Sequence, residues 1–137
     1  MSILTQAIYD RLRTDPALVA MISTYRGEPA VFTTDPAPGD AVMPLIVTAG
    51  EVTQTPWDTK DTRGRQIYRD VRCYTAADGS AMLVEAMAER VRALLHRYEL
   101  TIAGYRVIVA EVSGPTVADE QNAYARILSV RLVVEEV

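Results

Sequence analysis

Apolar residues near the beginning of the chain recur at helical spacing. The positions that share one side of this expected helix are Ile3, Leu4, Ala7, Ile8 and Leu12. Asp15-Pro16 then predicts the start of a second helix, because aspartate caps helices well and proline suits their first position. The pattern therefore predicts a helix, a kink, and a short second helix that reaches Ile22.

The segment 27–44 carries four of the seven prolines and two glycines. Proline fixes φ and removes a hydrogen-bond donor, so we expect a mostly irregular crossing segment with a brief strand at 30–33. Val31, Phe32, Val42 and Met43 supply apolar side chains. This segment is therefore expected to pack on the domain and not to act as a linker.

Two runs rich in β-formers, 45–55 and 65–75, read as paired strands. In the second run, Ile67, Val71 and Cys73 share one face, and polar residues alternate with them on the other face. The nine residues between the runs are mostly polar or turn-prone, with Trp57 among them. The sequence thus predicts a long hairpin with an extended tip.

Asp78-Gly79-Ser80 opens the strongest helical pattern of the chain, which extends to residue 98. Its apolar stripe consists of Leu83, Val84, Met87, Ala88, Val91, Leu94 and Leu95. A short strand at 100–102 and two longer strands, 105–112 and 124–134, follow, with a turn expected at Ser113-Gly114-Pro115. In the last strand the alternation predicts a buried face and a mixed face, with Val133 on the mixed one.

Paired strands with helices set apart indicate an α+β fold. We expect an antiparallel sheet of four to five strands with two main helices packed on one face. The chain shows no internal repeat and no second domain, so residues 1–137 are interpreted as a single domain.

Composition narrows the possible functions. Apolar residues make up 49% of the chain, as in a globular protein, and 14 basic against 18 acidic residues give a net charge of −4. That balance argues against a protein that neutralises many phosphates. No stretch approaches the roughly 18 apolar residues of a membrane span. The opening residues do not look like a signal peptide, so we expect the protein to be cytosolic.

A single histidine, His96, and a single cysteine, Cys73, leave little for catalysis. One cysteine forms no internal disulfide, and the pair falls short of a zinc site. We expect His96 to be a solvated, charged residue at a helix C-terminus and Cys73 to be a buried thiol on the inner face of a strand. Neither a nucleophile elbow nor a phosphate-binding glycine loop is present. We therefore predict no enzyme activity, no metal and no cofactor.

The segment 57–72 is the stretch whose composition suggests a partner. The candidate interface residues are Trp57, Asp58, Lys60, Asp61, Arg63 and Arg65. Two interpretations remain open from these residues: a surface loop with Trp57 folded back on the domain, or an arm that docks on a neighbouring subunit. Single-stranded nucleic acid is a weaker alternative, because one aromatic side chain is no stacking platform.

The order of these patterns resembles the tail-completion, or tail-terminator, family of long-tailed phages and phage-like gene transfer agents. The residues that carry the resemblance are the run 7–19, the proline-rich segment, Met43-Pro-Leu-Ile-Val-Thr-Ala-Gly50, the strand 69–79, the helix 82–98 and the final pair of strands. These are packing and turn motifs, and they transfer no catalytic residue.

The resemblance implies a ring, commonly a hexamer, that caps the tail tube at the head connector, stops tube growth and lets DNA pass through its channel. It places the protein in a virion at the head–tail junction, with the tube protein and a connector or stopper as partners. Two alternatives stay open: a head–tail stopper or adaptor, and a small α+β module that binds RNA or a metabolite.

Overall fold

The computed structural model describes residues 2–34 and 36–137, which form three helices and seven strands. In chain order these are α1 Ser2–Arg13, α2 Pro16–Val19, β1 Thr24–Tyr25, β2 Glu28–Pro29, β3 Val31–Phe32, β4 Leu45–Pro56, β5 Gly64–Ala76, α3 Met82–Leu95, β6 Tyr105–Val117 and β7 Ala123–Glu136. The long hairpin β4–β5 matches the sequence-based expectation closely. The final pair of strands is also present, but β6 is five residues longer than expected.

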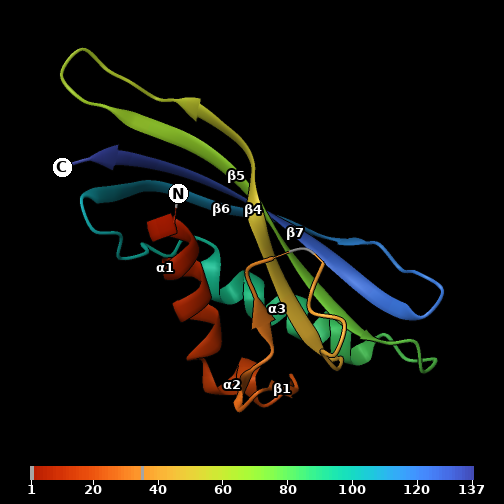
Figure 1. The fold of residues 1–137 in the computed structure, drawn as a ribbon. Coiled ribbons are helices and arrows are strands. Elements are labelled where there is room, and N and C mark those ends of the chain that lie inside the picture. Colours follow the sequence, from red (N-terminus) through yellow and green to blue (C-terminus); the bar gives the residue numbers. More distant parts are fainter. Residues whose placement is uncertain (1, 35) are drawn as a thin grey trace.

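Five strands form one twisted sheet in the order β3-β4-β5-β7-β6 (Figure 1). The pairs among β4, β5, β7 and β6 are antiparallel, which confirms the expected α+β fold. The short edge strand β3 runs parallel to β4. A separate two-stranded ribbon, β1–β2, was not predicted from the sequence.

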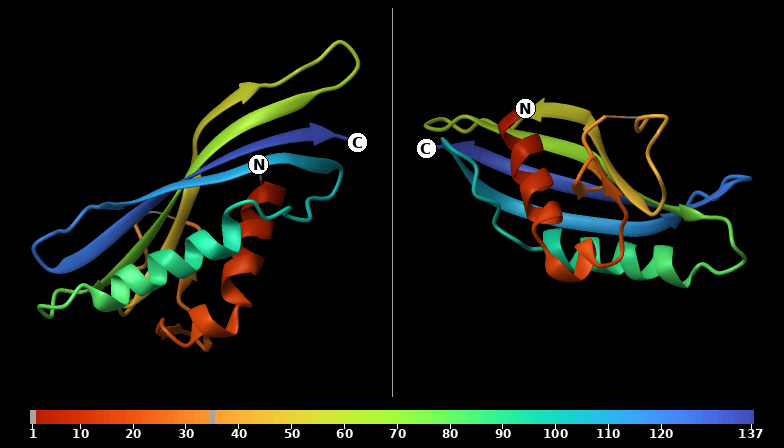
Figure 2. Two further views of the ribbon diagram at one scale, coloured as in Figure 1. Left: turned by 180° about the vertical axis from the view of Figure 1, so that it is seen from behind. Right: turned by 60° about the horizontal axis from the view of Figure 1, so that its bottom comes forward.

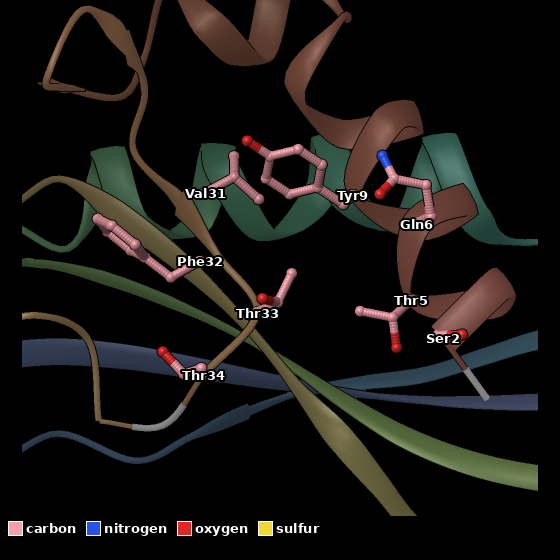
Figure 3. A pocket seen from close by; sticks show the side chains of 8 residues that line it. All are labelled: Ser2, Thr5, Gln6, Tyr9, Val31, Phe32, Thr33 and Thr34. Carbon is pink, nitrogen blue, oxygen red and sulfur yellow. The ribbon is translucent and has the colours of Figure 1, made fainter.

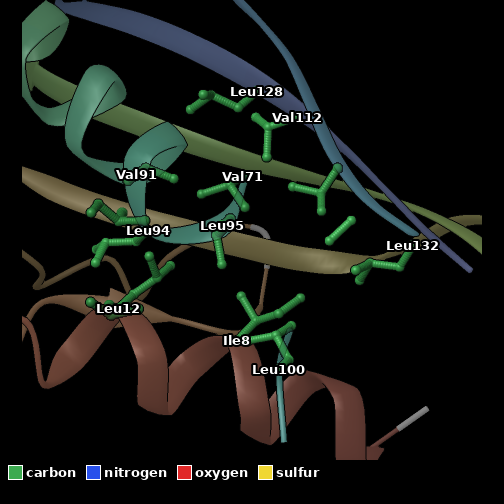
Figure 4. Close-up of a cluster of buried hydrophobic side chains, with 14 of the residues drawn as sticks. Ile8, Leu12, Val71, Val91, Leu94, Leu95, Leu100, Val112, Leu128 and Leu132 are labelled. Carbon is green, nitrogen blue, oxygen red and sulfur yellow. The ribbon is translucent and has the colours of Figure 1, made fainter. Parts of the chain in front are cut away.

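The helices α1 and α3 lie on one face of the sheet, and the core is between them and the strands (Figures 2 and 4). The stripe of α1 buries Leu4, Ile8 and Leu12 completely, although Ile3 remains exposed. Arg11 Nε donates to the Leu94 carbonyl oxygen at 3.1 Å, which joins α1 to the last turn of α3. The cation there also suits the helix dipole.

The proline-rich segment packs on the domain, as expected, around a second and smaller cluster. Ala30, Leu45 and Val47 are buried in this cluster, and Phe32 and Met43 are partly buried against it. Leu45 and Val47 alternate with Ile46, so they point to the sheet face that α1 and α3 leave free. Val42 was expected to pack as well, but it is 63% exposed.

Two further expectations, one about burial and one about a turn, are wrong. Leu83 was expected in the core but is 40% exposed in the first turn of α3, although Val84 beside it is fully buried. The second face of β7 is mixed, as expected: Val133 is buried there, opposite Val109 on β6 and Gln66 on β5, while Ser129 and Arg131 are partly exposed. The strand β6 continues through Gly114-Pro115 as an irregularity in the ladder, so the turn to β7 lies at residues 118–122.

The helix boundaries also differ from the pattern in detail. Asp15 caps α2 and Pro16 occupies its first position, as predicted, but α2 ends at Val19 and does not reach Ile22. The helix α3 ends at Leu95. Instead of a short strand, the segment 100–102 forms an isolated bridge between Ile102 and Tyr105.

Candidate functional site

The turn between β4 and β5 projects beyond the rest of the sheet (Figure 1). We call residues 57–63 the hairpin tip. It contains five of the six interface candidates. The sixth, Arg65, is the second residue of β5, the strand that follows. Every residue from 52 to 60 is exposed, so the end of β4 and the start of the tip are open to solvent on both faces.

Hydrogen bonds give the hairpin tip a defined shape. The Trp57 amide donates to the Gly64 carbonyl oxygen at 2.8 Å, and the Gly64 amide donates to Asp58 Oδ1 at 3.1 Å. Nearer the apex, the Thr59 amide donates to the Thr62 carbonyl oxygen at 2.9 Å. Lys60 and Asp61 therefore occupy the apex of a closed turn and not a loose loop.

Gly64 stands where the tip joins the sheet, and the local packing requires a glycine. A Cβ atom at this position would lie 2.6 Å from the Val134 carbonyl oxygen and 2.7 Å from the Trp57 carbonyl oxygen. Next to it, the Glu136 amide donates to the Arg63 carbonyl oxygen at 2.8 Å. The base of the tip is thus held against the end of β7.

The side chains of the tip are largely open to solvent. Trp57 is 45% exposed. Among the residues whose side chains the structure describes, none forms an ion pair with Lys60, Asp61 or Arg63. Arg65 lies 6.0 Å from the centre of the Tyr105 ring, at the base of the tip. An indole with both signs of charge around it suits a protein surface as partner.

Arg69 belongs to the same stretch of sequence but not to this surface. It is fully buried on the core face of β5, where its Nη1 donates to Thr5 Oγ1 at 2.9 Å. The alternation of β5 places Arg69 on the face of Ile67 and Val71, a sign that was available in the sequence.

The two residues considered for catalysis have structural roles. Cys73 is fully buried, and burial raises the pKa of its thiol to about 12, which leaves it unreactive. His96 is the C-terminal cap of α3 and is partly buried. Its Nδ1 accepts a hydrogen bond from the Val112 amide at 3.0 Å. The imidazole thus joins α3 to β6.

A hollow of about 520 Å³ lies between α1 and β3 (Figure 3). The described residues that line it are Ser2, Thr5, Gln6, Tyr9, Val31, Phe32, Thr33 and Thr34. They bring no carboxylate, imidazole or thiol to this hollow, so they provide neither a general base nor an activated nucleophile.

The described residues lack two kinds of feature. They contain no group of three or more histidine, cysteine, aspartate or glutamate side chains placed to hold a metal ion. None of the described helices has both the length and the apolar character needed to cross a bilayer.

Sequence reasoning missed a second exposed surface, at the opposite end of the sheet. Met82 is 79% exposed in the first turn of α3, and Val117 is 62% exposed at the end of β6. Leu83, expected in the core, is exposed beside Met82. A signal was available in the helical pattern: Leu83 lies at the edge of the apolar stripe, whereas Val84 in the same turn lies nearer its centre and is fully buried.

A family model described as "Tail completion protein gp17" matches residues 6–135, nearly the whole chain. The chain belongs to the tail completion protein family. It is thus a structural protein of a phage-type tail, and its place is the virion. No curated protein matches the chain in sequence.

The fold has a counterpart among solved structures. A chain from the "Virion of native gene transfer agent (GTA) particle" superposes with a TM-score of 0.77 at 22% identity, covering 96% of this chain and 94% of that chain. The tail completion protein described here shares that fold over almost its full length.

Proposed function

We propose that this tail completion protein is a tail terminator. In this role it forms a closed ring, a hexamer, that caps the tail tube, ends its polymerisation and joins it to the head connector, and a channel remains for DNA. The observation that carries the proposal is the family match over residues 6–135, which leaves almost no part of the chain for another function.

The shape of the subunit supports a ring. A closed ring of identical subunits uses two different surfaces of each copy, one on either side of the contact. This chain has an exposed hairpin tip at one end of the sheet and exposed apolar residues at the other (Figure 2). In the proposal, Trp57, Asp58, Lys60, Asp61, Arg63 and Arg65 make contacts with a neighbouring subunit or with the tube.

The negative net charge of the chain supports the proposed channel for DNA. Each subunit carries a net charge of −4, so a ring of any size is acidic. DNA that slides through a channel must not be held by its phosphates, and tight phosphate binding requires a basic surface. The partners we propose are therefore other copies of the chain, the tube protein and the connector, with no sequence-specific contact to DNA.

The test is to image the purified chain, alone and mixed with tail tubes, and to weigh it by native mass spectrometry. We expect a species at six times the 15.1 kDa subunit mass and a ring on one end of each tube. Binding to isolated connectors in place of tube ends would instead indicate a stopper or adaptor. A chain that stays monomeric and never associates with tubes would overturn the proposal.

A further inference from the structure

The two ends of the sheet carry different surfaces. The strand β5 begins at Gly64, beside the hairpin tip, and ends at Ala76, opposite Ala123 at the start of β7. The turn at 118–122 and the start of α3 therefore lie at the far end from the tip (Figures 1 and 2). At about 3.3 Å per residue, the thirteen residues of β5 separate the two ends by roughly 40 Å.

The exposed residues of the far end form one connected surface. Val117 is opposite Arg126 in the ladder, so their side chains share the face on which α3 lies. Arg126 Nη2 is 3.4 Å from Glu85 Oε1, and its Nη1 is 2.9 Å from Asp119 Oδ1. Glu85 is one helical turn from Met82.

We call this the far-end surface. Its members are Met82, Leu83, Glu85, Glu89, Val117 and Asp119.

The far-end surface is apolar and acidic. Met82, Leu83 and Val117 are exposed, and Glu85, Glu89 and Asp119 supply three carboxylates around them. The basic side chain nearest to them, that of Arg126, is 6% exposed and lies between two of these carboxylates, Glu85 and Asp119. A partner approaching this surface meets negative charge and apolar area.

The hairpin tip with Arg65 has the complementary character. Its three basic residues outnumber its two acidic ones, and Asp58 is turned inward onto the Gly64 amide. Lys60 and Arg63 are exposed and form no ion pair with any described side chain. Trp57 adds a large, partly exposed aromatic surface next to them.

We infer that the far-end surface of one subunit receives the hairpin tip of a second copy of the same chain. The inference rests on the proposed ring function and specifies how its subunits meet. Trp57 packs on Met82 and Leu83, where an aromatic ring gains both buried area and a sulfur contact. Lys60 and Arg63 lie near the carboxylates of the far-end surface, which orients the contact.

The contact is head-to-tail, because its two halves are different surfaces on opposite ends of the subunit. Each copy therefore offers one tip and one far-end surface, and both are used when a ring closes. A contact between two tips would instead produce a two-fold dimer and leave the far-end surface free.

Charge reversal tests this arrangement. The tip variant is Lys60→Glu/Arg63→Glu, and the far-end variant is Met82→Lys/Glu89→Lys; all four positions are exposed and lack ion pairs with described residues, so folding is preserved. Each variant alone should need about tenfold or more protein for half-assembly, because like charges then face each other. An equimolar mixture should recover rings of alternating copies, since both of its contacts are again complementary.

Control variants carry a charge change of the same sign at other positions. Arg26 has a side chain that is 78% exposed, and Val42 is 63% exposed; neither belongs to the hairpin tip or to the far-end surface. Arg26→Glu and Val42→Lys should each assemble within about twofold of the unmodified chain, because isolated surface charges contribute little. Thermal melts of all variants, as monomers, check that each one folds.

Cross-linking gives a second readout. Asp61→Cys and Met82→Cys place one thiol on the tip and one on the far-end surface, and the native Cys73 is fully buried and does not compete. Under mild oxidation, disulfide-linked dimers should form in the mixture of the two variants and not within either variant alone.

The outcomes distinguish failure of this inference from failure of the proposed function. Dimers of Asp61→Cys alone would show a tip-to-tip contact and overturn the inference. Rings that tolerate both charge reversals and give no mixed disulfide would also overturn it, while the proposed ring function would stand. If the unmodified chain never forms rings, with or without tubes, the proposed function fails and this inference fails with it.

Discussion

Arg90 and Asp15 are joined by two hydrogen bonds, from Nε to Oδ2 at 2.8 Å and from Nη2 to Oδ1 at 2.6 Å. The same carboxylate accepts the Leu18 amide at 2.9 Å, as the cap of α2. One aspartate therefore begins α2 and ties it to the middle of α3, across 75 residues of sequence. This connection fixes how the N-terminal helices sit against the main helix.

Asp15→Ala removes both functions of the carboxylate. We expect the free energy of unfolding at pH 7 to fall by about 1–3 kcal/mol, because a helix cap and a bidentate ion pair are lost together. Urea denaturation followed by circular dichroism measures it.

Glu28→Ala is the matched control. Glu28 is 64% exposed and is paired with Arg13 at 3.3 Å, so its removal should change the free energy of unfolding by no more than about 0.5 kcal/mol. Equal losses in the two variants would contradict the importance assigned to Asp15.

Acid should weaken the same connection. The hydrogen bonds from Arg90 hold the pKa of Asp15 below its ordinary value of 3.8, and the Leu18 amide adds to this. A lowered pKa stabilises the fold above the unfolded-state pKa, and that contribution is lost as pH falls through the folded-state pKa. The difference in unfolding free energy between the natural chain and Asp15→Asn should thus be constant above about pH 5 and shrink below about pH 4. Urea titrations from pH 7 to pH 3 test this, and a difference that grows on acidification would refute it.

Local patterns predicted the middle of each element better than its surroundings. Alternation correctly placed Ile67, Val71 and Cys73 in the core, because side chains of a strand alternate strictly between its faces. It also gave the last strand a mixed second face, where Val133 is buried and Arg131 is partly exposed, but local sequence does not reveal which of these positions the neighbouring strands cover. The turn expected at Ser113-Gly114-Pro115 failed: β6 is an edge strand, where a proline and a bulge are tolerated within the strand.

The two candidate surfaces differ in how far sequence could reveal them. The hairpin tip was predictable, because a polar stretch with one tryptophan between two strands of alternating pattern marks an exposed turn. The far-end surface was not, because Leu83 shares its helical face with Met87 and Leu94. Leu83 lies at the edge of the stripe and is exposed, while Val84 in the same turn is fully buried.

The helix α3 offers a direct comparison of these two leucines. Leu94 is 3% exposed and Leu83 is 40% exposed. We expect Leu94→Ala to lower the free energy of unfolding by about 2–5 kcal/mol, because it leaves a cavity in the core. Leu83→Ala should cost less than about 1 kcal/mol, since little buried area is lost. Urea denaturation of the two variants in parallel decides this, and similar losses would contradict the placement of Leu83.

Gly64 should be sensitive to a single methyl group. The Cβ of Gly64→Ala would lie under 3 Å from two carbonyl oxygens of the backbone, so strand β7 or the hairpin tip must shift. We expect a loss of about 1–3 kcal/mol in unfolding free energy. Gly39→Ala is the control, because nothing lies within 4 Å of its Cβ and the stability should be unchanged or slightly raised. A Gly64→Ala chain as stable as Gly39→Ala would show that the tip is not held as described.

Trp57 should matter to assembly and not to folding. It is 45% exposed at the end of the hairpin, so Trp57→Ala should lower the melting temperature of the isolated subunit only slightly, while raising the concentration needed for half-assembly by about tenfold. Trp57 is also the single tryptophan of the chain, so its emission should shift to the blue when rings form and water leaves the indole. Trp57→Phe, which keeps an aromatic ring, should retain most of the assembly. A Trp57→Ala subunit that assembles normally, with no spectral change in the natural chain, would remove the tip from the interface.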